Sequence, residues 1–259
     1  MMLNMVPART GILWVKLGIR TFFKQPLALA GLFFMFMAVM TITSQVPFIG
    51  FVLAMALLPP ATLGLMSGTL EATQGKFPMP LILLTAFRAG KPKTRTMLAL
   101  GGLYAMGFLL AMGASYLVDG GDFARVYLGG ASPTREMVMA ADFQGAMWVF
   151  LGLHLPLSLM FWHAPALVYW HDLPAVKSIF FSFVACARNF WAFAVFGLMW
   201  LSVLVLAVVL ITTLTALLGM PDLAGDILFP ALLMLASMFF TSLYFTFRDI
   251  FEPAPEATP

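Results

Sequence analysis

The stretch FWHAPALVYWHDLPAVKSIFFSFVACARNFWAF, residues 161–193, shows how this chain is organised. It begins at the end of a long apolar run and passes Pro165 and the polar pair His171 and Asp172. It then enters a short amphipathic segment that leads into the next apolar run. This order is typical of a membrane span that ends, a helix on the membrane surface, and a second span that begins. The stretch therefore predicts a helical protein that crosses a membrane more than once.

The composition of the whole chain supports this prediction. Of its 259 residues, 62% are hydrophobic and 10% are charged, whereas about 25% are charged in a typical soluble domain. Such a chain cannot cover its apolar surface with polar side chains, so it needs lipid as a solvent. Its net charge of +3 is too small to indicate nucleic-acid binding. The single cysteine, Cys186, excludes an intrachain disulfide and a cysteine metal cluster.

Apolar runs and their breaks predict an all-α integral membrane fold with six transmembrane helices. We place the spans at 26–44, 46–65, 96–118, 145–166, 191–218 and 227–247, and amphipathic surface helices at 9–24, 80–91 and 174–189. Residues 1–251 would form one polytopic domain, followed by a disordered tail at 252–259. Each surface helix precedes a pair of spans, which suggests three helical-hairpin repeats. The alternative is that basic loops simply alternate with spans, as they do in many polytopic proteins.

Basic residues gather on one side of this predicted topology. Twelve of the fourteen Lys and Arg residues lie on the side of the termini, and only Arg125 and Arg135 lie on the other. By the positive-inside rule, both termini are cytoplasmic. In residues 9–24 the basic positions fall on one helical face, opposite Trp14 and Phe22. We expect the apolar face to enter the acyl chains and the basic face to meet anionic headgroups. Candidate headgroup contacts are Arg9, Lys16, Arg20, Lys24, Arg88, Lys91, Lys93, Arg95, Lys177 and Arg188.

Few polar residues fall inside the predicted spans. His154 lies in the fourth span, where we expect a neutral imidazole that donates a hydrogen bond to a facing helix. A role in proton or substrate contact is the alternative. In the sixth span Ser237, Thr241, Tyr244 and Arg248 follow helical spacing, and they either join helices or line a cavity.

The positions of residues along the chain lead to two further predictions, one for the third span and one for the loop before residue 174. Small residues recur every four positions in the third span, at Gly101 and Ala105 and in the series Gly107, Ala111 and Ser115, which predicts close contact with another helix. The alternative is a glycine-rich span without a special partner. We expect Asp172 to cap the surface helix that follows it.

Two stretches resemble a known family. PARTGILWVKLGIRTFFKQP at 7–26 and WHAPALVYWHDLPAVKSIFFSFVACARNFWAF at 162–193 are similar to an uncharacterised family of six-span inner-membrane proteins from proteobacteria. The matching positions are Pro7, Ala8, Gly11, Trp14 and Pro26, then 164–167, Trp170, His171 and 185–189. The resemblance implies a bacterial inner membrane and a helical fold. It carries over no catalytic residue.

The sequence offers no identifiable catalysis, cofactor or metal site. His154, His163 and His171 lack metal-ligand spacing, and no phosphate loop or nucleophile elbow occurs. We therefore favour a membrane protein that engages anionic lipid or a membrane partner, with a homo-oligomer as one form of that partner. Two alternatives stay open. One is a transporter or lipid-handling protein with a cavity near His154 and the sixth span, and the other is an embedded enzyme that uses the histidines.

Overall fold

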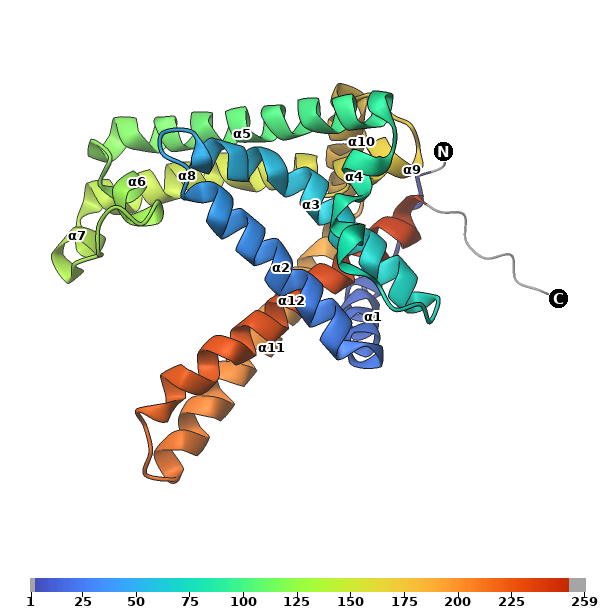
Figure 1. Ribbon diagram of the computed structural model, residues 1–259. Coiled ribbons are helices and arrows are strands. Elements are labelled where there is room, and N and C mark those ends of the chain that lie inside the picture. Colours follow the sequence, from blue (N-terminus) through green and yellow to red (C-terminus); the bar gives the residue numbers. More distant parts are fainter. Residues whose placement is uncertain (1–2, 252–259) are drawn as a thin grey trace. The chain divides into compact units, whose positions relative to one another are not determined.

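The computed structural model describes residues 3–251, and these are helical with no strand among them. The helices are labelled in Figure 1. In chain order they are α1 (Thr10–Lys24), α2 (Pro26–Ser44), α3 (Gly50–Thr73), the 3₁₀ helix η1 (Pro80–Leu84), α4 (Thr85–Arg88), α5 (Lys91–Asp119), α6 (Asp122–Tyr127), α7 (Arg135–Met139), α8 (Ala141–Phe161), α9 (Ala164–Trp170), α10 (Ala175–Arg188), α11 (Phe190–Leu217) and α12 (Leu223–Phe251). The predicted tail at 252–259 lies outside the described residues.

Within residues 3–251, six helical segments are long and apolar enough to cross a membrane. They are Pro26–Ser44, Gly50–Thr73, Lys91–Asp119, Ala141–Trp170, Phe190–Leu217 and Leu223–Phe251. This confirms the prediction of an all-helical membrane fold with six spans. The order of a short helical segment and two long helices also recurs, as α1–α2–α3, then η1 and α4 before α5 and α8, then α10–α11–α12.

The second and fourth spans differ from the expected ones. The second span begins at Gly50 and continues through Pro59 and Pro60 to Thr73, although we expected those prolines near its end. The fourth was expected to end at residue 166, but its apolar segment runs to Trp170. This segment is interrupted: α8 ends at Phe161, and Pro165 lies in the first turn of α9, where its missing N–H costs no helical hydrogen bond.

The chain divides into two compact units. Within the described residues, unit 1 contains 3–40, 60–90 and 184–251, and unit 2 contains 41–59 and 91–183. Helices α2, α3 and α10 each contribute residues to both units. That residues 1–251 form a single domain stays a prediction, and the units are described one at a time.

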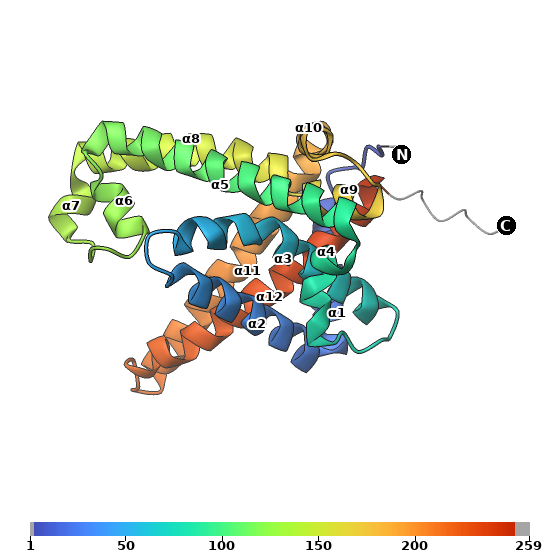
Figure 2. The same ribbon diagram turned by 45° about the horizontal axis from the view of Figure 1, so that its top comes forward.

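Unit 2 is built on α5 and α8, which lie side by side in Figures 1 and 2. Small residues on α5 make this packing close. Ala111 and Ser115 are buried, and a Cβ added at Gly107 would lie 2.6 Å from a methyl carbon of Leu157 on α8. The predicted small-residue contact face of the third span is thus present. Towards α6 and α7 the core is aromatic and apolar: Phe108, Ala111, Met112, Phe123, Phe143, Ala146 and Phe150.

Unit 1 is organised around the C-terminal half of α12. From Ser237 to Phe247 nearly every side chain is buried. Helix α1 packs on α12 and α11, and α11 packs on α12. Helix α2 meets α12 through the rings of Phe33 and Phe36, whose centroids lie 5.4 and 5.5 Å from that of Phe240. The N-terminal half of α12 and the C-terminal half of α11 are mostly exposed.

Candidate functional site

The basic helix α1 is held closely against α11 and α12. A Cβ added at Gly11 would overlap the carbonyl oxygen of Ala192, and one at Gly18 would lie 2.5 Å from Cβ of Ser242. The Trp14 ring is fully buried, with centroids 5.3 Å from Phe193 and 5.9 Å from Phe196. Because glycine has no side chain, the backbone of α1 can approach α11 at Gly11 and α12 at Gly18. The Trp14 indole fills the space between the helices.

This packing corrects one expectation about α1. Its apolar face was expected to enter the acyl chains, but Trp14, Val15 and Phe22 are buried, and α1 packs on α11 and α12. The helical period shows that a face is apolar, yet lipid and protein cover such a face equally well. Whether lipid or protein covers the face depends on the partner helices, which lie far away in the sequence.

The opposite face of α1 carries the predicted basic stripe. Arg9, Lys16, Arg20 and Lys24 are all exposed, and within residues 3–251 none of the four makes an ion pair. A surface hollow of about 490 Å³ lies at the start of this face, lined by Pro7, Arg9, Thr10, Ile12, Leu13 and Lys16. The hollow thus combines two cationic side chains with apolar ones.

Asp249, near the end of α12, links α1 to α12. One carboxylate oxygen accepts a hydrogen bond from Trp14 Nε1 at 2.9 Å. The other accepts one from Arg248 Nε at 2.8 Å and lies 2.7 Å from a terminal guanidinium nitrogen of Arg248. The Arg248 guanidinium also lies 5.0 Å from the centre of the Phe245 ring. Asp249 thus has donors on both oxygens, which satisfies a largely buried carboxylate.

Asn189, between α10 and α11, holds the N-terminal segment. Its Oδ1 accepts from the Val6 amide at 2.8 Å, and its Nδ2 donates to the Asn4 carbonyl at 3.2 Å. Asn4 also reaches α12, where its backbone N–H donates to the Ile250 carbonyl at 2.8 Å. These contacts join sequence positions more than 180 apart, and sequence reasoning did not identify Asn4, Asn189 or Asp249. No local pattern reveals such pairings.

The polar stripe of the sixth span lies in the packed part of unit 1. Ser237 donates to the Leu29 carbonyl of α2 at 3.2 Å, and Thr241 donates to the Ser237 carbonyl at 2.8 Å. Tyr244 is buried and Arg248 pairs with Asp249. Of the two roles left open for this stripe, the contact of Ser237 with α2 matches that of joining helices, whereas the hydrogen bond of Thr241 and the ion pair of Arg248 lie within α12.

The remaining candidate headgroup contacts differ in their surroundings. Arg88, Lys91, Arg95, Lys177 and Arg188 are exposed. Lys93 instead has partners in the protein: its Nζ lies 2.9 Å from an Asp172 carboxylate oxygen and 2.8 Å from the Tyr169 carbonyl. Asp172 has a positive φ of 55° and precedes α10 by three positions, so it does not cap that helix as expected.

The three histidines lie in different surroundings in unit 2. The His154 ring stacks on Phe150 at 5.0 Å and meets Phe108 edge-on at 5.6 Å, while its Nδ1 is buried without a hydrogen-bond partner. The expected interhelical hydrogen bond is therefore not made at Nδ1. His163 is fully buried, and its backbone amide donates to the Ser182 hydroxyl at 2.9 Å.

His171 lies just after the fourth span. Burial lowers its pKa, and the neighbouring Asp172 carboxylate opposes this effect. Among residues 3–251, no group of three or more His, Cys, Asp or Glu side chains is arranged to hold a metal ion.

An apolar hollow of about 370 Å³ lies between α11 and α12. It is lined by Trp200, Leu201, Leu204, Leu232, Leu235, Ala236 and Phe239. Neither Tyr244 nor His154 lines it, although those residues were expected around a transport cavity. The hollow opens on the mostly exposed part of the hairpin, where lipid chains can fill it.

Comparison with known proteins places the chain in a family. No family model matches it, and no solved structure matches it. A relative from Burkholderia thailandensis, named "Probable inner membrane protein", is 35% identical over 265 residues, which covers 100% of this chain and 98% of the relative. The stretches that carried the resemblance at 7–26 and 162–193 supply Gly11, Trp14 and Asn189, which hold α1 and the N-terminal segment in place. The chain belongs to the family of this bacterial protein, and it is a multi-span inner-membrane protein.

Proposed function

We propose that the protein binds anionic phospholipid in the cytoplasmic leaflet through the outward face of α1. The observation that carries the proposal is the division of this helix into two faces. Arg9, Lys16, Arg20 and Lys24 are exposed, while the opposite face is fixed on α11 and α12. Twelve of fourteen basic residues lie on the side of the termini in the predicted topology, which supports a cytoplasmic position for α1 and both termini.

The hollow beside Arg9 and Lys16 supports a specific mode of binding. A guanidinium can donate two parallel hydrogen bonds to a phosphodiester, and a lysine ammonium adds a second charge. Leu13, which lines the same hollow and is 46% exposed, gives the start of an acyl chain an apolar contact. Because α1 is already fixed on its buried face, little conformational entropy is lost when a lipid binds.

Binding should depend on charge and on salt. Each Lys or Arg near an anionic surface contributes roughly 1 kcal/mol, an effect that ions screen. Full-length protein in mild detergent should therefore bind fluorescent phosphatidylglycerol more tightly than phosphatidylcholine, and the difference should shrink as salt rises. Replacing Arg9 and Lys16 by glutamine should raise the Kd for phosphatidylglycerol about 30-fold, from roughly 2 kcal/mol in total.

A matched control separates this site from general charge effects. Arg135→Gln removes a cation from α7, on the side opposite the termini, and should leave the Kd unchanged. Equal affinity for the two lipids at low salt would refute the proposal. So would an equal loss of binding in Arg135→Gln and in the double variant.

A further inference from the structure

The exposed side of α1 carries the same short pattern twice. Each set consists of a cation, an apolar side chain and a second cation in chain order. The first set is Arg9, Leu13 and Lys16, and the second set is Arg20, Phe23 and Lys24. All six side chains are exposed or half-buried, and with 3.6 residues per turn they fall within roughly 100° around the helix axis. Both sets therefore lie on one face of the helix.

Contacts inside unit 1 determine the rotation of α1 about its axis. Gly11 lies against α11, and Gly18 lies against α12. Between them, the Trp14 indole donates a hydrogen bond to Asp249. These three points on two partner helices keep α1 from turning, so the apolar side chains of both sets stay beside the cations instead of rotating into the protein.

The two sets are close at their inner ends and separated at their apolar positions. Lys16 and Arg20 are one helical turn apart in the chain, so their Cβ atoms lie about 5–6 Å from each other. Leu13 and Phe23, which are 46% and 62% exposed, lie about 15 Å apart along the helix axis. A ligand that uses both sets therefore needs two neighbouring anionic groups and apolar parts that extend to either side of them.

Diphosphatidylglycerol has this order of groups. It consists of two phosphatidyl groups joined through one glycerol, so its two phosphates are neighbours and its acyl chains lie on both sides of them. A guanidinium and an ammonium in each set can pair with one phosphodiester. Phosphatidylglycerol has one phosphate and can occupy only one set at a time.

We propose that α1 binds a single molecule of diphosphatidylglycerol, with one phosphatidyl group on the first set and the other on the second set. This inference rests on the proposed binding of anionic phospholipid and names the lipid that the site selects. When one phosphatidyl group is bound, the other is held beside the second set at a high effective concentration. The affinity for the two-phosphate lipid therefore exceeds the affinity for a lipid that uses one set.

Competition with fluorescent phosphatidylglycerol measures this selectivity on the full-length protein in mild detergent. Unlabelled diphosphatidylglycerol should displace the probe at a concentration about tenfold or more below that of phosphatidylglycerol with the same acyl chains. Phosphatidate is the control for charge, because a phosphate monoester carries roughly −1.5 to −2 charge at pH 7. That is close to the charge of two phosphodiesters, but it lies on one phosphorus. Equal competition by phosphatidate and diphosphatidylglycerol would overturn the inference.

A double variant tests the second set. Arg20→Gln with Lys24→Gln should weaken the binding of diphosphatidylglycerol about tenfold, whereas the affinity for phosphatidylglycerol, which the first set retains, should change less than about threefold. The replaced side chains are exposed, so the contacts that hold α1 on α11 and α12 remain. An unchanged preference for diphosphatidylglycerol in this variant would contradict the role of the second set.

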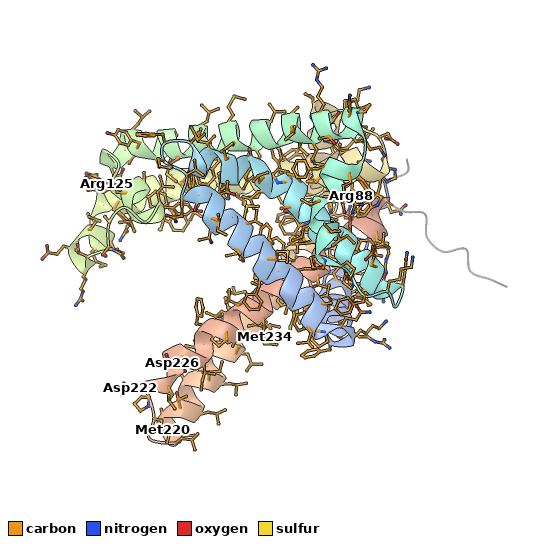
Figure 3. All side chains as sticks on the ribbon, in the orientation of Figure 1. Arg88, Arg125, Met220, Asp222, Asp226 and Met234 are labelled. Carbon is orange, nitrogen blue, oxygen red and sulfur yellow. The ribbon has the colours of Figure 1, made fainter. Side chains whose placement is uncertain are left out.

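A matched control removes the same charge elsewhere in unit 1. Figure 3 shows Arg88 on α4, and Arg188 ends α10; both are exposed. Arg88→Gln with Arg188→Gln should therefore leave both affinities unchanged. If this control lost as much binding as the variant of the second set, net charge would explain the effect and the inference would be wrong.

The inference and the proposed function fail in different ways. If phosphatidylglycerol binds better than phosphatidylcholine but diphosphatidylglycerol has no advantage over phosphatidylglycerol, the protein binds single phosphates and only the inference is wrong. If the protein prefers no anionic lipid to phosphatidylcholine, both are wrong.

Discussion

Asp249 determines how the first helix of the chain is fixed to the last. Its carboxylate accepts hydrogen bonds from Trp14 and from Arg248, so each oxygen has a donor in a largely buried place. Removing a donor leaves part of that charge without compensation, which costs more than the loss of contact area alone. The residue therefore contributes to stability through two neighbours that lie far apart in the sequence.

Trp14→Phe should destabilise the protein by about 1.5–3 kcal/mol, the range for a hydrogen bond to a charged group. The variant keeps a ring between α11 and α12 but loses the indole N–H. Unfolding in mixed micelles, followed by circular dichroism, measures the free energy. Trp191→Phe is the matched control, because Trp191 is 72% exposed, and its unfolding free energy should stay within about 0.5 kcal/mol of the parent protein. Equal effects of the two changes would contradict the role given to Trp14.

Cys186 should be unreactive in the folded protein. Burial leaves it 2% exposed and raises the pKa of its thiol to about 12, so almost no thiolate forms at pH 7. Maleimide in detergent at pH 7 should label less than a tenth of the protein, and complete labelling should follow denaturation in SDS. Rapid labelling of the folded protein would show that α10 opens at this position.

Among the helices, α3 and α5 show how a proline and a glycine act together. Pro60 has no N–H to donate to the Ala56 carbonyl one turn earlier, so that carbonyl loses its helical partner. A Cβ at Gly101 of α5 would overlap this oxygen, which means that the absence of a side chain lets α5 approach it. The close approach of α5 thus lies at the carbonyl that Pro60 leaves without its helical donor.

Gly101→Ala and Gly102→Ala should have opposite effects on stability. Alanine at 101 forces α5 away from α3 and should cost about 1–3 kcal/mol, as overpacking does. Gly102 is exposed and a Cβ there meets nothing within 4 Å. Alanine at 102 should therefore stabilise the helix by about 0.5–1 kcal/mol. The unfolding assay used for Trp14 measures the change in free energy for both variants. Changes of the same sign would contradict the close approach at Gly101.

Sequence patterns predict some elements well and their neighbours poorly. The six spans follow from apolar runs because lipid requires about 20 apolar residues per crossing, whatever the helix packs against. The interior position of Pro59 and Pro60 could not be predicted, since a proline in a helical pattern usually indicates an end or a kink of the helix. In the same way the exposure of Arg9 and Lys16 follows from their spacing, whereas the pairing of Lys93 with Asp172 depends on a fold that brings residues 93 and 172 together.

At the scale of the whole molecule, the distribution of charge predicts which side faces the cytoplasm. In the predicted topology only Arg125 and Arg135 lie on the side opposite the termini, in the segment that contains α6 and α7. The candidate lipid site could be predicted as a basic face, because charge and helical period are properties of the chain itself. The hollow at its start and the helices behind it needed the structure.

Cysteines at two exposed positions should report opposite sides of the membrane. In a Cys186→Ala background, Ser132→Cys should react with an impermeant maleimide on intact spheroplasts, and Gln74→Cys should react only after the membrane is opened. Both positions are exposed, so access to the reagent depends on the side of the membrane. Labelling of both cysteines in intact spheroplasts would refute the six-span topology with cytoplasmic termini.

The link between Trp14 and Asp249 also has a consequence for synthesis. The two residues are 235 positions apart, and a ribosome that adds about 5–20 residues per second needs about 12–47 s to make the intervening chain. Until α11 and then α12 are made, the apolar face of α1 has neither partner helix to cover it, so the nascent helix must lie in the membrane interface or in the insertion machinery. Unit 1 closes only after translation of α12, and a chain truncated before Asp249 leaves its first helix without its final partner.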